Sequence, residues 1–107
     1  MITDIRSYDD LDLEVTEKKG HVLVDLYAGW CRPCKVMMPF IEHAAELLPE
    51  VSFCRINIDE QEELAESFHI PGVPCYVLFH DGEEKGRIIG YRNQDTFLAA
   101  IKKLLAK

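Results

Sequence analysis

Apolar positions follow two different periods along this chain. Residues 21–28 are apolar almost without interruption, which is typical of a strand buried in a parallel sheet. Residues 31–48 instead carry apolar side chains every three or four positions, which predicts a helix with one buried face. The members of that face are Cys34, Met37, Ile41, Ala44 and Leu48. Pro39 lies within this helix and is expected to kink it.

Similar signals divide the rest of the chain. Ser7 followed by Asp10 predicts a capped helix, and Asn93 caps a final helix. The turn at Asp81 and Gly82 predicts an antiparallel hairpin. The expected strands are residues 2–6, 21–28, 51–58, 76–80 and 85–91, and the expected helices are residues 7–19, 31–48, 59–68 and a last helix from 93 onward.

This order of elements, βαβαβαββα, predicts an α/β fold. A mixed central sheet with helices on both faces is the simplest architecture for it, and ligands of such sheets gather at the carboxyl ends of the strands. With 107 residues, 48% of them apolar, the chain is long enough for one domain, residues 1–107, with a single core.

The net charge and the N-terminal sequence disfavour some classes of function and location. The net charge of −7 disfavours nucleic acid as a partner, and the acidic stretches at residues 9–14 and 59–63 are most simply solvated helix faces. The N-terminal residues resemble no signal peptide, and no segment approaches the length that spans a membrane. We therefore expect a soluble cytoplasmic protein with no membrane association.

Cys31 and Cys34 directly follow the buried strand and open a helix. At this spacing their β-carbons lie about 5 to 6 Å apart, close enough for a reversible disulfide. The helix N-terminus stabilises a thiolate on Cys31, the expected nucleophile, while Cys34 is the expected resolving thiol. Arg32 and Lys35 add positive charge, and Pro33 gives up only an N–H that has no partner in the first turn.

Two other interpretations of the cysteines remain open at this point. A purely structural disulfide would close a ring of four residues and stabilise the fold by only about 2 kcal/mol. A zinc site would have to recruit Cys54 and Cys75, which lie singly on separate strands. The four histidines, His21, His43, His69 and His80, have no metal-ligand spacing, so we expect no metal.

Together these residues resemble the thioredoxin family along nearly the whole chain. A lone Cys-x-x-Cys is a weak signal, but a preceding buried Asp, a proline in the helix and a downstream Val-Pro make the combination specific. The resemblance implies the thioredoxin fold. The matching segments are residues 22–25, 30–35, 56–59 and 70–74, together with Pro39, Phe79, Asp81, Gly82 and Gly90.

The resemblance also implies a substrate groove. Pro74 corresponds to the family's cis-proline, whose loop lies against the cysteine pair and offers the backbone of Val73 to an extended substrate segment. From the sequence alone, an ordinary trans proline at the start of a strand is the alternative. The implied substrate-binding residues are Trp30, Arg32, Pro33, Gly72, Val73 and Gly90.

Asp25 is a lone carboxylate among apolar neighbours, so burial is expected to raise its pKa. The resemblance places it beneath Cys34, where it would accept the proton of the resolving thiol directly or through a water. Arg55 stands where the family usually has lysine, and its permanent charge is expected to restrain that rise. The alternative is a partly hydrated Asp near a strand end with no catalytic role.

Two further departures from the family pattern affect the expected chemistry. Arg32 replaces the usual glycine, and its charge should stabilise the thiolate and make the protein more oxidising than a typical thioredoxin. Cys75 replaces the usual threonine after the cis-proline. It is either an inert core thiol or a group that exchanges with the active-site pair or helps bind a metal or cluster. Cys54 is interpreted as core filler.

The sequence therefore predicts a thioredoxin-like protein disulfide reductase, a thiol-disulfide oxidoreductase without a bound cofactor. Its expected partners are disulfide-containing substrate proteins and a thioredoxin reductase, a flavoprotein that draws on NADPH, and we expect a monomer. One alternative is a redox-switchable binding module that clasps a partner protein. The other is a more oxidising disulfide oxidase or isomerase, which usually works in an oxidising compartment.

Overall fold

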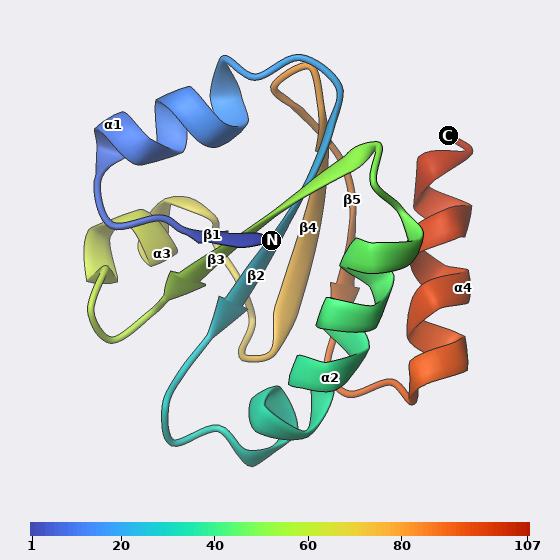
Figure 1. Ribbon diagram of the computed structural model, residues 1–107. Coiled ribbons are helices and arrows are strands. Elements are labelled where there is room, and N and C mark those ends of the chain that lie inside the picture. The colour runs from blue at the N-terminus through green and yellow to red at the C-terminus, as the bar shows by residue number, and fades with distance from the viewer.

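The computed structural model describes all 107 residues as a five-stranded mixed sheet with helices on both faces (Figure 1). The strand order is β1-β3-β2-β4-β5. Strands β1, β3 and β2 are parallel, and β4 is antiparallel to both of its neighbours, β2 and β5. The elements in chain order are β1 (Ile2–Asp4), α1 (Tyr8–Leu11), the π-helical stretch η1 (Asp12–Thr16), β2 (His21–Tyr27), α2 (Arg32–Leu47), β3 (Val51–Asn57), α3 (Glu62–Ser67), β4 (Cys75–His80), β5 (Glu83–Ile89) and α4 (Gln94–Leu105). No helix is both long and apolar enough to cross a membrane.

Two apolar layers fill the space between the sheet and its helices. Helices α1 and α3 lie on one side of the sheet, and α2 and α4 lie on the other (Figure 1). Because successive side chains of a strand point to opposite faces, β2 supplies both layers: Val22, Val24 and Leu26 face α1 and α3, and Leu23 faces α2 and α4. The near-continuous apolar run in the sequence is thus explained by a central strand that is covered on both sides.

Side-chain caps and a tight turn fix the element ends. Ser7 Oγ accepts a hydrogen bond from the Asp10 N–H at 3.0 Å, and Asn93 Oδ1 accepts one from the Thr96 N–H at 2.9 Å. Asp81 and Gly82 both have positive φ, which matches the right-handed twist of a two-residue hairpin. A β-carbon at Gly82 would collide with the Thr16 carbonyl oxygen, so this position excludes larger residues.

The predicted order and type of the elements are confirmed, whereas several boundaries were wrong. The helix expected over residues 7–19 ends at Thr16, and its second half is π-helical. The helix expected over residues 59–68 begins only at Glu62, because Asn57 Oδ1 accepts hydrogen bonds from the N–H groups of Asp59 and Glu60 and holds them in a turn. Strand β1 ends at Asp4 rather than residue 6, and β5 covers Glu83–Ile89 rather than residues 85–91.

Candidate active site

Cys31 and Cys34 lie where β2 leaves the sheet and α2 begins, and they are joined by a disulfide with their α-carbons 5.3 Å apart. Cys31 is the N-cap of α2 with an extended backbone, and its Sγ accepts a hydrogen bond from the Cys34 N–H at 3.2 Å. Pro33 occupies the first turn, where its missing N–H leaves nothing unsatisfied. One backbone amide of the first turn, that of Cys34, therefore points at the sulfur of Cys31.

The cysteine pair is nearly covered by its own loop and its neighbours. Cys31 and Cys34 form a small buried cluster with Ala28, against which Ile58 and Val73 pack. Three of the expected substrate-binding residues surround this cluster on the outside, because Trp30, Arg32 and Pro33 are exposed. Apart from the N-terminal Met1, Trp30 has the most exposed large apolar side chain of the protein, with 69% of its surface accessible.

The loop before β4 approaches the same cluster. The Val73–Pro74 peptide bond is cis, and Val73 packs on the cysteine cluster. The Pro74 carbonyl accepts a hydrogen bond from the Gly90 N–H at 2.9 Å, which brings the end of β5 next to this loop. Gly72 is exposed beside Val73. The structure thus gathers residues from three distant segments of the sequence around the disulfide.

Before Pro74, the backbone of this loop is unusual in having no hydrogen-bond partner within the chain. Neither the N–H nor the C=O of Val73 forms a hydrogen bond within the chain, and the same holds for Ile70 and Gly72. Polar backbone groups are nearly always paired in folded proteins, with the chain itself, water or a ligand. Residues 70–73 therefore present free donors and acceptors beside the redox pair.

Asp25 is buried on the α2 side of the sheet, with 3% of its surface exposed. Arg55, its register partner on β3, donates from Nε to Asp25 Oδ2 at 3.1 Å, whereas Oδ1 is buried without a hydrogen-bond partner. Burial raises the pKa of Asp25 to about 6, and the charge and hydrogen bond of Arg55 hold it from rising further. Both expected influences on this pKa are confirmed.

Tyr27 is a participant that the sequence analysis missed. The Arg55 guanidinium lies 3.6 Å from the centroid of the Tyr27 ring, a cation–π contact that holds the arginine over the same sheet face. A signal was present, because Tyr27 follows Asp25 by two residues on one strand and so shares its face. Only the register of β2 with β3, which pairs Asp25 with Arg55, turns that signal into a contact.

Cys54 and Cys75 lie in a different part of the molecule. Both belong to the apolar layer under α1 and α3, and Cys75 has no exposed surface. Burial raises the pKa of Cys54 to about 11 and also raises the pKa of Cys75. Cys75 is paired with Leu26 and points to the face opposite Asp25, so the sheet separates it from the α2 side. These positions match inert core thiols and do not complete a zinc site with Cys31 and Cys34.

Comparison with known proteins decides the family. The Thioredoxin family model matches residues 4–103, which is nearly the whole chain. The chain belongs to the thioredoxin family. The thioredoxin of Chlamydia pneumoniae is 39% identical over 84 residues, which cover 78% of this chain and 82% of that protein. Thioredoxin-1 of Saccharomyces cerevisiae is 32% identical over 106 residues, which cover 99% of this chain and 97% of that protein.

Solved thioredoxin structures have the same fold. The thioredoxin of Malassezia sympodialis superimposes with a TM-score of 0.86 at 29% identity, covering 97% of this chain and 93% of that one. Mitochondrial thioredoxin 3 of Saccharomyces cerevisiae, in its oxidised form, gives a TM-score of 0.85 at 28% identity, covering 98% and 93%. The predicted thioredoxin fold is confirmed, and so is the predicted class of enzyme: this thioredoxin-family protein is a thiol-disulfide oxidoreductase with a disulfide reductase function.

Proposed function

We propose that the protein reduces disulfides of other proteins through two successive thiol-disulfide exchanges in which Cys31 attacks and Cys34 resolves. The Cys31 thiolate attacks one sulfur of the substrate disulfide, and the other substrate sulfur leaves as a thiolate. Cys34 then attacks Cys31 Sγ and releases the second substrate thiolate. Two electrons pass to the substrate, and the Cys31–Cys34 disulfide is the oxidised product.

The hydrogen bond from the Cys34 N–H to Cys31 Sγ is the observation that carries this assignment. A backbone donor aimed at sulfur stabilises a thiolate more than a thiol, and so do the positive end of the α2 dipole and the adjacent Arg32. Cys34 lies one turn further into the helix and accepts no such bond through its sulfur. The asymmetry supports Cys31 as the group that attacks first and Cys34 as the group that follows.

Asp25 is the proposed acceptor of the Cys34 proton, directly or through a water. Its pKa of about 6 means that it is mostly ionised at neutral pH yet basic enough to take a proton. Oδ2 is held by Arg55 while Oδ1 has no partner, so one oxygen remains available for the transfer. In this proposal Arg55 acts through Asp25 as a positioning residue.

The unpaired backbone of residues 70–73 is the proposed docking edge for substrate. An extended segment of the substrate can add to it as a strand, with main-chain hydrogen bonds to Val73 and with Trp30, Arg32, Pro33, Gly72 and Gly90 as its surroundings. Pro74 positions this loop against the cysteine cluster. Main-chain hydrogen bonds depend little on the side chains of the substrate, so this mode of docking suits a reductase that acts on several proteins.

The remaining parts of the proposal concern the setting. The protein works in the cytoplasm as a monomer, and a thioredoxin reductase that draws on NADPH supplies its electrons. Support for these points comes from the family to which the chain belongs.

Turnover of a disulfide-containing protein, with dithiothreitol as the electron source, tests the assignment of the cysteines. We expect Cys31→Ser to abolish turnover and Cys34→Ser to accumulate a covalent enzyme–substrate disulfide, visible by mass spectrometry. The matched control Cys54→Ala changes a buried cysteine of the other layer and should retain turnover. A Cys31→Ser/Cys34→Ser variant that still retains a partner protein while lacking turnover would favour the binding module.

A further inference from the structure

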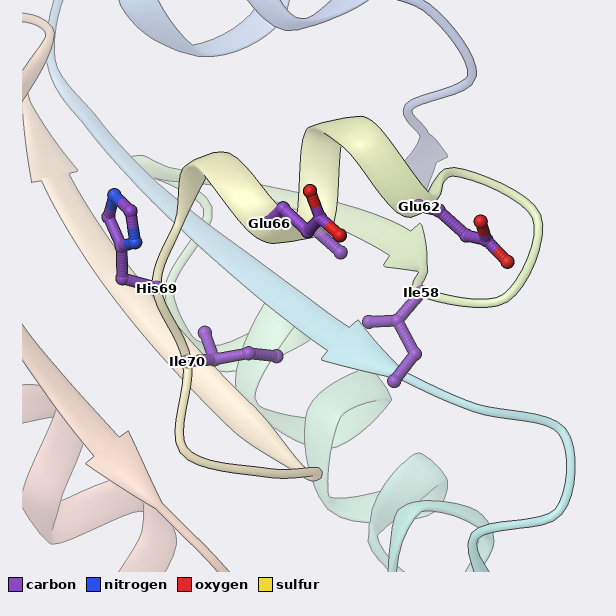
Figure 2. A pocket seen from close by; sticks show the side chains of 6 residues that line it. Ile58, Glu62, Glu66, His69 and Ile70 are labelled. Atoms are coloured by element: carbon purple, nitrogen blue, oxygen red, sulfur yellow. The ribbon is translucent and has the colours of Figure 1, made fainter.

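A groove lies between α3 and the loop that precedes β4, with a volume of about 400 Å³ (Figure 2). Figure 2 shows Ile58 and Ile70 extending toward each other beneath the helix, with Glu62 and Glu66 coming from the helix itself. The groove therefore combines an apolar floor with carboxylates along one edge. Its lining residues are Ile58, Glu62, Ala65, Glu66, His69 and Ile70.

This groove is continuous with the surroundings of the redox pair. Ile58 lines it on one side and packs against the buried cluster of Ala28, Cys31 and Cys34 on the other. Ile70 lines it as well and begins the segment, residues 70–73, whose backbone lacks partners. A chain that pairs with Val73 and continues along this segment reaches the groove after about three residues at about 3.3 Å each.

The side of the groove formed by His69 is held in place by Arg87 from β5. Arg87 donates to the carbonyl of Phe68 at 2.6 Å and to the carbonyl of His69 at 3.1 Å. Glu84 fixes the same guanidinium through both of its carboxylate oxygens, at 2.6 and 3.0 Å. His69 itself has a positive φ of 51°, a conformation that these bonds stabilise. The groove is thus preformed rather than assembled by a ligand.

Two carboxylates at its edge lack partners. Glu62 and Glu66 are four residues apart on α3, so they lie on one face of the helix and repel each other. Neither forms an ion pair or a side-chain hydrogen bond within the chain, in contrast to Glu14 with Lys18 and Glu84 with Arg87. A cation placed near both would relieve that repulsion.

We propose that the groove binds the side chain of a lysine or arginine that lies about three residues from the reacting cysteine of the substrate. The aliphatic stem of such a residue packs on Ile58 and Ile70, and its charged head reaches Glu62 and Glu66 at the exposed edge. The net charge of −7 favours the approach of a basic segment. This inference rests on the proposed docking of substrate along residues 70–73 and adds a preference to it.

The test compares disulfide-bonded peptides that differ at one position. One set carries lysine three residues before or after the cysteine, and the matched set carries glutamine there. We expect the wild-type protein to reduce at least one lysine peptide with a kcat/KM about three- to fivefold higher than its glutamine counterpart, a gain that falls as salt is added. In Glu62→Gln/Glu66→Gln this ratio should fall to about one.

A control variant separates the groove from the general acidity of the region. Glu60→Gln/Glu63→Gln removes the same charge from the same stretch but does not line the groove, so it should keep the lysine preference. Denaturant unfolding verifies that both variants are folded. Equal loss of preference in the two variants overturns the proposal, and so does equal reduction of lysine and glutamine peptides by the wild type. Failure to reduce any peptide would instead contradict the proposed reductase function.

Discussion

Cys31 and Cys34 at the start of α2 differ sharply in surroundings from Cys54 and Cys75 in the sheet, although exposure does not separate them. The exposed fractions are 4% and 3% for the first two residues and 2% and 0% for the others. Cys31 receives a backbone N–H and sits beside exposed basic residues, whereas Cys54 and Cys75 are surrounded by apolar side chains of one core layer. The reactivity of these thiols is therefore set by local donors and charge rather than by access alone.

The largest expected effect is on thiol alkylation, which compares these cysteines directly. In the reduced protein at pH 7, we expect iodoacetamide to modify Cys31 at least a hundredfold faster than Cys54. With a pKa of about 11, Cys54 carries a thiolate in only about one molecule in ten thousand at that pH. Peptide mass spectrometry over time gives the rates. Comparable rates at Cys75 would show that the thiol under α1 and α3 is less isolated than its packing indicates.

Asp25 extends the comparison to a buried acid, and its raised pKa makes folding stability depend on pH. The folded chain holds the proton with a pKa of about 6 against an ordinary value of 3.8, so the stabilisation is fully present below about pH 4 and is lost as pH rises through about 6. Denaturant unfolding should show the oxidised wild type less stable at pH 7 than at pH 4 by about 2 kcal/mol from this group. Asp25→Asn should remove that contribution. A pH dependence identical in both proteins would contradict it.

The same substitution removes a destabilising contribution at pH 7, but it should slow turnover. Asp25→Asn leaves Cys34 without its proton acceptor, so we expect reduction of a protein disulfide at pH 7 to slow about tenfold or more. The wild-type rate of the resolving step should rise through about pH 6 as Asp25 ionises, and the variant should lack that rise. Stopped-flow measurement of Trp30 fluorescence during resolution can follow both. An unchanged rate would leave Asp25 with a structural role only.

The smallest expected effect concerns the charge next to Cys31. Arg32→Gly should lower the reduction potential of the Cys31–Cys34 pair by about 10 to 20 mV, because a surface charge near a helix N-terminus stabilises the thiolate by well under 1.4 kcal/mol, which corresponds to 30 mV. Equilibration with a thiol redox buffer measures it. Arg92→Gly is a suitable control, since Arg92 bonds to the carbonyls of Ile89 and Tyr91 rather than adjoining a cysteine. A higher reduction potential in Arg32→Gly would contradict the expectation that Arg32 makes the pair more oxidising.

Local patterns in the sequence were sufficient to predict the order of the helices and strands and the redox-active cysteine pair. The apolar run before Cys31, the capping residues Ser7 and Asn93, and the Asp81-Gly82 turn each act within a few residues, so the sequence contains them directly. The raised pKa of Asp25 also follows from a carboxylate inside an apolar strand.

Features that depend on distant contacts were not predictable in this way. The late start of α3 depends on Asn57, the cation–π contact of Arg55 depends on the register of two strands, and the shape of the groove depends on Arg87 reaching Phe68 and His69. The π-helical second half of the first helix has no evident cause in its sequence, and we have no physical account of it.

The hydrogen bond between the Cys34 amide and Cys31 Sγ also couples the electron chemistry to folding. Oxidation and unfolding form a closed thermodynamic cycle, so a contact that favours the reduced pair in the folded chain and is absent in the unfolded chain must stabilise the reduced fold by the same free energy. A shift of about 30 mV therefore appears as a relative change of about 1.4 kcal/mol between the stabilities of the two redox forms. Because of this contact in the first turn of α2, the free energy of unfolding differs between the reduced and the oxidised protein, and measuring it shows which form is present.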